Sequence, residues 1–149
     1  MTILPTLEGG LRLQMQVERD WQVLMALSFD ASHDLAGDLS GLMDEESMWE
    51  DLIEPELRAL FSHQVTQVEA QVRAARKGGE SSITIGAEDA DVWYGALNQA
   101  RLAMEANYQF GPTEEGKSIE SMERGKQQAF FRERFYCQLQ SLLLEYVME

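Results

Sequence analysis

The sequence predicts a predominantly helical α+β domain with about four main helices and a small antiparallel sheet. Two observations indicate this class. Apolar residues recur at helical spacing along four long stretches, whereas only two short stretches alternate apolar and polar residues with a period of two. A chain of 149 residues has the size of one ordinary domain, so we expect a single core and a single domain over residues 1–149.

The chain is expected to open with a β-hairpin and a helix. Residues 3–7 and 11–17 flank Gly9 and Gly10, and the second stretch alternates, which is typical of a hairpin that turns at the glycines. Its apolar face would consist of Leu11, Leu13, Met15 and Val17. Helical spacing then predicts a first helix over about residues 18–35.

A loop, a long helix and a third strand are expected in the middle of the chain. Glycines and acidic residues break the pattern over residues 37–54, which we interpret as a loop carrying a short helix. Pro55 suits a first helical turn, and the apolar spacing continues to the C-cap candidates Gly78 and Gly79. The β-branched stretch Ser82–Ile85 is expected to add a strand beside the hairpin.

Two further helices complete the predicted fold. The third runs from an acidic start at Glu88 to a stop at Gly111-Pro112, and its apolar stripe includes Trp93. The fourth spans about Ser118 to Tyr146. Besides its main stripe it carries a second set of apolar residues, which could support a homodimer: Phe131, Phe135, Leu142 and Leu144.

Charge and composition exclude several classes of protein. The chain has 26 acidic and 12 basic residues, a net charge of −14, which argues against a duplex nucleic-acid binder because such proteins need a basic face. No apolar run approaches the roughly 20 residues that span a bilayer, and no secretory leader is recognisable. One cysteine, Cys137, excludes an internal disulfide. We therefore expect a cytoplasmic protein without membrane contact.

The sequence offers no convincing catalytic, metal or cofactor motif. Asp30-x-x-His33 is one weak match to a di-iron motif that must occur twice, and His63 has no triad partner nearby in sequence. Cys137 lies among apolar helical residues, where we expect a thiol to act as a small core hydrophobe. We therefore predict a non-enzymatic protein with no catalytic residues, no metal and no cofactor.

The acidic residues are concentrated in the first third of the chain. Residues 44–56 contain seven acids and no base, and helical spacing would place four large apolar side chains on one face with acids such as Glu50 and Asp51 around it: Met48, Trp49, Leu52 and Ile53. Two interpretations remain open. This face packs on the domain's own core, or it binds a basic protein partner that its charge attracts.

The middle of the chain resembles a known family. Glu54-Pro55-Glu56-Leu57 opening a helix, a short strand, and then Trp93 followed by residues 97–104 (LNQARLAM) are similar to an uncharacterised, mainly actinobacterial family of AosR-like proteins, some of which are described as oxidative-stress transcription regulators. The resemblance implies a mostly helical regulator that acts through protein contacts, in the described case with the transcription machinery, and it implies no active site. The redox behaviour of that family depends on a close pair of cysteines, whereas Cys137 stands alone here.

Two interpretations of Arg101 are open. It lies beside the apolar stripe of the third helix, and a partly buried guanidinium needs a carboxylate partner, for which we predict Glu56 at the start of the preceding helix. Alternatively, Asn98 and Arg101 line a pocket for a small molecule or a reaction between the third and fourth helices.

Overall fold

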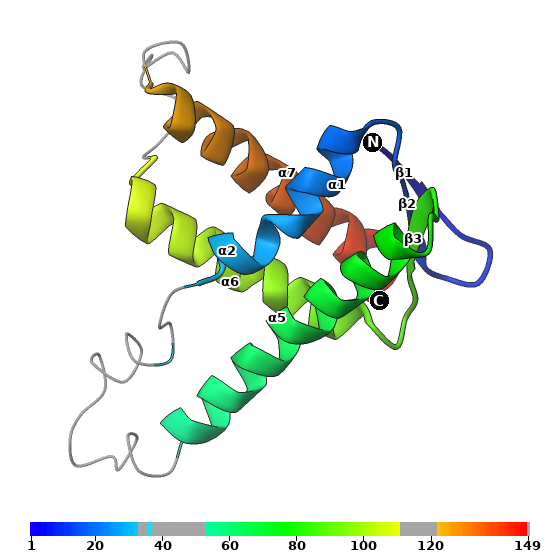
Figure 1. Ribbon diagram of the computed structural model, residues 1–149. Coiled ribbons are helices and arrows are strands. Elements are labelled where there is room, and N and C mark those ends of the chain that lie inside the picture. Colours follow the sequence, from blue (N-terminus) through cyan, green and yellow to red (C-terminus); the bar gives the residue numbers. More distant parts are fainter. Residues whose placement is uncertain (33–35, 37–52, 111–121, 149) are drawn as a thin grey trace.

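Three short strands and a set of helices make up the part of the chain that the computed structural model describes, which is residues 1–32, 36, 53–110 and 122–148 (Figure 1). In chain order the elements are β1 (Thr2–Pro5), β2 (Leu11–Gln14), α1 (Glu18–Met25), α2 (Leu27–Asp30), α5 (Glu54–Lys77), β3 (Ser82–Ile85), α6 (Ala90–Tyr108) and α7 (Arg124–Tyr146). The predicted class, a predominantly helical α+β fold with a small antiparallel sheet, is confirmed.

The sheet joins the N-terminal hairpin to the strand that follows α5. Its order is β1-β2-β3, both pairs are antiparallel, and Leu13 stands opposite Ile3 on one side and Ile83 on the other. Leu11, Leu13 and Met15 are buried, as predicted. The prediction is wrong for Val17, which is 60% exposed because the strand ends at Gln14 and Val17 is the N-cap residue of α1.

The single helix expected over residues 18–35 is instead two helices that meet at Ala26, and residues 33–35 lie outside the described part. In an unbroken helix the carbonyl of Val23 would accept the N–H of Leu27. Here that carbonyl accepts a hydrogen bond from the Tyr136 hydroxyl at 3.2 Å. A side chain that takes a carbonyl out of the helical ladder is a common cause of such a break.

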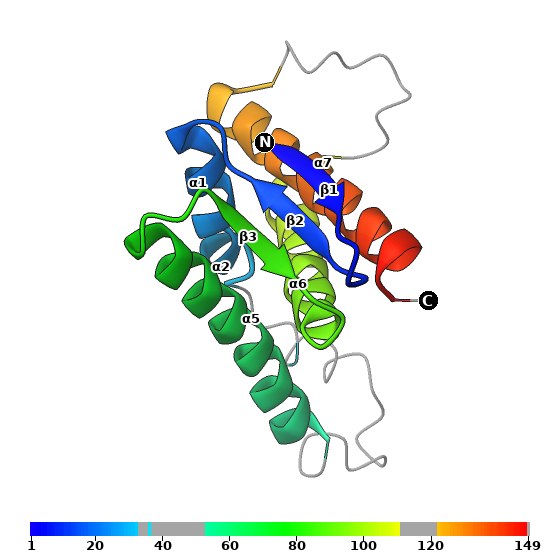
Figure 2. The ribbon, with the colours of Figure 1, turned by 90° about the vertical axis from the view of Figure 1, so that its right-hand side faces the viewer.

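The three long helices form most of the core. Helix α6 is the central one, because it packs against both α5 and α7, and its predicted stripe is buried from Trp93 to Met104. In α5 only the second half is buried, from Val68 onward, whereas Leu57 and Phe61 are partly exposed. In Figure 2 the sheet lies in front of α6, with α5 on one side of it and α7 on the other.

Helix α7 begins at Arg124, and the residues before Met122 that were expected to open it lie outside the described part. The later residues of its predicted stripe are buried as expected: Phe130, Tyr136, Leu139 and Leu143. Cys137 is half-buried, so it lies at the edge of the core rather than inside it. Among the described helices, none is both long and apolar enough to cross a bilayer.

Candidate functional site

Most of the acidic surface patch predicted from the sequence lies outside the described residues, namely Met48, Trp49, Glu50, Asp51 and Leu52. Ile53 is described. It occupies the N-cap position of α5 and is 40% exposed, so at least this apolar side chain is in contact with solvent.

Arg101 has a different carboxylate partner from the one predicted. Its Nε donates to Oε1 of Glu133 at 3.1 Å, and its Nη1 donates to Oε1 of Gln140 at 2.5 Å. The prediction of Glu56 is wrong because this face of α6 turns towards α7, where residues 133 and 140 lie on one side of the helix. Glu56 lies in the exposed first turn of α5.

The carboxylate of Glu133 is stabilised from two sides. Arg134 donates to its second oxygen at 2.8 Å, while Arg101 holds the first. Burial alone would raise the pKa of Glu133, but the hydrogen bonds from Arg134 and Arg101 outweigh burial and hold that pKa below its usual value. Glu133 is therefore ionised at neutral pH and ties α6 to α7.

The alternative pocket near Asn98 and Arg101 gains no support from this geometry. The guanidinium of Arg101 is used by internal partners, and Asn98 is exposed on the surface of α6. Neither residue lines any of the three cavities described below.

A second buried charge cluster, which the sequence analysis missed, joins α2 to α7. Arg132 donates two hydrogen bonds to the carboxylate of Asp30, at 2.8 and 2.9 Å, and the Tyr136 hydroxyl donates a third at 2.7 Å. The Asp30 side chain is 1% exposed. The only local signal was Asp30 in the Asp30-x-x-His33 match, and His33 lies outside the described residues.

The electrostatics of this cluster favour a permanent structural link. Burial, followed by the neighbouring Asp30 carboxylate, raises the pKa of Tyr136 far above its usual range. The hydrogen bond to Asp30 raises the pKa of Arg132, against the effect of burial. Tyr136 is therefore a neutral donor and Arg132 a cation at neutral pH.

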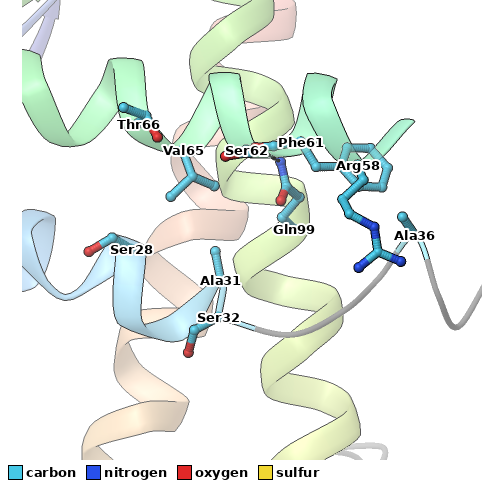
Figure 3. A pocket seen from close by; sticks show the side chains of 10 residues that line it. All are labelled: Ser28, Ala31, Ser32, Ala36, Arg58, Phe61, Ser62, Val65, Thr66 and Gln99. Atoms are coloured by element: carbon cyan, nitrogen blue, oxygen red, sulfur yellow. Dashed lines mark hydrogen bonds between the residues drawn. The ribbon is translucent and has the colours of Figure 1, made fainter. Parts of the chain in front are cut away.

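A small hydroxyl-lined pocket lies where α2 faces α5 and α6 (Figure 3). Its volume is about 230 Å³, and Ser28, Ser62 and Thr66 contribute hydroxyl groups. The Nε2 of Gln99 donates to the carbonyl of Phe61 at 3.1 Å and to Gln64 at 3.0 Å, while Arg58 pairs with Glu54 one turn away. The Gln99 amide and the Arg58 guanidinium thus already bind protein atoms, and the volume of the pocket is below that of most ligand sites.

Two further features bear on function, a small second pocket and the distribution of possible metal ligands. A pocket of about 50 Å³ between α1 and α5 is too small for most ligands. Among the described residues, no group of three or more histidines, cysteines or carboxylates is close enough to hold a metal ion. His63 is exposed on α5.

The largest of these three cavities is an open groove between α1 and α7, with a volume of about 1040 Å³. In Figure 2, α1 and α7 lie on either side of the first residues of β1. Its lining includes partly buried or exposed apolar side chains, which we call its floor, among them Ile3, Val23, Phe131, Phe135 and Leu142. Its charged side chains, which we call its rim, are Arg19, Asp20, Arg124 and Arg132, and the N-terminal ammonium of Met1 lies 3.3 Å from Asp20. We call this feature the α1–α7 groove.

The groove contains three of the four apolar residues that the sequence analysis assigned to a possible homodimer surface. Phe131, Phe135 and Leu142 line it, and Leu144 does not. The apolar spacing along α7 could identify these positions, whereas their position opposite α1 could not be foreseen. Phe131 is 58% exposed, an unusual degree for a phenylalanine.

Comparison with known proteins gives one match. A family described as "Domain of unknown function (DUF2017)" matches residues 8–147, which is nearly the whole chain and includes every element from β2 to α7. No curated protein and no solved structure shows a significant match to the chain.

Proposed function

We propose that this chain, which belongs to the DUF2017 family, is a non-enzymatic protein-interaction domain with a regulatory role. The observation that carries the proposal is the α1–α7 groove, a wide, open cavity with an apolar floor and a polar rim. A surface that combines exposed apolar side chains with polar ones is typical of protein-binding sites.

The shape of the groove favours a macromolecular partner over a small molecule. Ligand sites enclose most of a small molecule's surface, whereas this groove is open and has a largely exposed Phe131 on its α7 side. Exposed aromatic side chains of this kind are frequent anchors of protein interfaces.

The regulatory part of the proposal rests on the resemblance to AosR-like proteins, and with it a cytoplasmic role related to stress or transcription. Cys137 is the one cysteine of the chain and is half-buried, so a disulfide could form only with a thiol from another molecule. The proposed regulation therefore works by occupancy of a binding surface and not by an internal disulfide.

A second contact remains part of the proposal, supported by the exposure of Ile53 and by the seven acids of residues 44–56. This acidic patch, with Met48 and Trp49 as its anchors, would suit a basic protein. A Met48→Ser/Trp49→Ser variant tests it independently of the groove.

The test is affinity capture from the host's lysate with the parent chain and with Phe131→Ser, read by quantitative mass spectrometry. The control is Phe29→Ser, which removes an equally large and more exposed aromatic side chain outside the groove. We expect a partner that the parent and the control retain and that Phe131→Ser loses. Identical protein sets from all three chains would contradict the proposal for the groove.

A further inference from the structure

The α1–α7 groove has the length of a helix. Its α7 wall is one continuous face, with groove residues at positions 124, 128, 131, 135, 138 and 142. At 1.5 Å per residue, the distance from Arg124 to Leu142 is about 27 Å along the helix axis, equal to roughly five helical turns. A partner helix lying along this wall could place an apolar side chain on the floor at every turn.

The rim of the groove is basic, although the chain as a whole is strongly acidic with a net charge of −14. Two of its four charged residues have internal partners: Arg132 binds Asp30, and Asp20 lies 3.3 Å from the N-terminal ammonium and accepts the backbone N–H of Gln16. Within the described part of the chain, Arg19 and Arg124 form no ion pair. These two exposed cations therefore give the rim its charge.

We propose that the α1–α7 groove binds an acidic amphipathic helix of a partner protein. This inference rests on the proposed function and specifies the chemistry of the partner at that site. The apolar face of the helix would cover Phe131, Phe135 and Val23, while its carboxylates would lie against Arg19 of α1 and Arg124 of α7. Binding in this way buries the exposed Phe131 and pairs the two free guanidinium groups.

This preference for an acidic partner is opposite to the one expected from the net charge of the chain. A chain of net charge −14 should attract basic peptides and repel acidic ones at long range. A preference for an acidic helix can therefore arise only from a local basic surface, which makes the comparison of an acidic with a basic peptide diagnostic. Within the described residues, this groove combines such a surface with an apolar floor.

The experiment uses two labelled peptides of about 20 residues with the same apolar helical face of leucine and phenylalanine, long enough to fill the groove. One carries glutamate at the remaining positions and the other carries lysine. Fluorescence anisotropy measures their binding to the parent chain. We expect the glutamate peptide to bind more tightly, with an affinity that falls as salt is added.

Two double variants locate the contact. We expect Arg19→Glu/Arg124→Glu to weaken binding of the glutamate peptide by roughly tenfold or more, because two attractive contacts become repulsive. The control Arg12→Glu/Lys77→Glu makes the same change of net charge at exposed residues outside the groove, and it should bind as the parent does.

Several results would overturn the inference. These are equal or tighter binding of the lysine peptide, no binding of either peptide, or equal losses of affinity in both double variants.

A parent chain that sediments as a dimer, and as a monomer after Phe131→Ser, would assign the groove to a second copy of the chain. The proposed function fails separately, if Phe131→Ser retains every captured partner. If that variant loses a partner and the peptides show no acidic preference, only the charge inference is wrong.

Discussion

Replacing Arg132 with methionine removes the cation from the buried pair that joins α2 to α7. The Asp30 carboxylate, with a side chain 1% exposed, would lose hydrogen bonds of 2.8 and 2.9 Å and keep the Tyr136 hydroxyl as its remaining side-chain partner. Removing one partner of a buried ion pair costs about 3–5 kcal/mol of unfolding free energy. Arg132 itself is 20% exposed, so water can replace part of its contribution, and we expect about 3 kcal/mol.

The assay is urea unfolding of the parent and the variant at neutral pH, supported by thermal melts in which about 3 kcal/mol lowers the Tm by roughly 6–12 °C. Arg134→Met is the matched control. It removes the next arginine along α7, which is 51% exposed and whose partner Glu133 keeps Arg101. Because Arg134 is half-exposed, water can replace most of its contact with Glu133, and we expect this variant to cost about 0–1 kcal/mol.

A double variant separates the lost pair from lost packing. In Arg132→Met/Asp30→Leu no charge is left buried, and we expect the double variant to be more stable than Arg132→Met alone. The reasoning would be refuted if Arg132→Met cost no more than Arg134→Met, or if the two substitutions destabilised the protein additively.

Three other substitutions have defined outcomes. Arg101→Met should cost about 1–2 kcal/mol in urea unfolding, because a buried carboxylate, Glu133, loses one of its two cations; unchanged stability would show that this contact is not structural. Burial alone would raise the pKa of Asp20, but backbone hydrogen bonds and the N-terminal ammonium outweigh burial and lower that pKa in the fold. The contribution of Asp20 to the free energy of unfolding is therefore present above its unfolded pKa of about 3.9, and it is lost as pH falls through the folded value. Asp20→Ala should therefore cost about 1 kcal/mol at neutral pH and almost nothing in acid, and a difference independent of pH in denaturation curves would contradict this. Gly10→Ala should lower the free energy of unfolding by about 1–3 kcal/mol in thermal melts, because the added Cβ would stand 2.5 Å from the carbonyl oxygen of Ile85. A Tm equal to that of the parent would show that the backbone at Ile85 moves away from the new methyl group at no cost.

Local periodicity was enough to predict the elements that depend on nearby residues. The strand Ser82–Ile85, the long helix ending at Lys77 and the buried stripe of α6 from Trp93 to Met104 all agree with their spacing in the sequence. Each of these elements buries one face whose residues are at most four positions apart, which is the range over which spacing carries information.

The features that the sequence could not predict depend on residues far apart in the chain. At the break near Ala26 the carbonyl of Val23 binds the hydroxyl of Tyr136, which lies 113 residues further along the chain. The partner of Arg101 depends on which side of α6 faces α7, and a single sequence offers Glu56 and Glu133 as equally good carboxylates. The Asp30–Arg132 pair joins positions 102 residues apart, and no local pattern marks it.

The groove was predictable in part. The sequence placed Phe131, Phe135 and Leu142 off the main stripe of α7, so an unpartnered apolar face could be foreseen. Its second wall and its charge could not, because they depend on α1 bringing Arg19 alongside α7. The partner chemistry inferred from the structure is accordingly different from the basic partner that the acidic residues 44–56 suggested.

Amide hydrogen exchange of the chain with and without a bound partner tests the central claim most directly, using either the acidic peptide or a captured protein. Binding in the α1–α7 groove should slow exchange in α1 and along α7 from Arg124 to Leu142, and it should leave the first half of α5 unchanged. Protection confined to α2 and the first half of α5, around the pocket of Figure 3, would contradict the account.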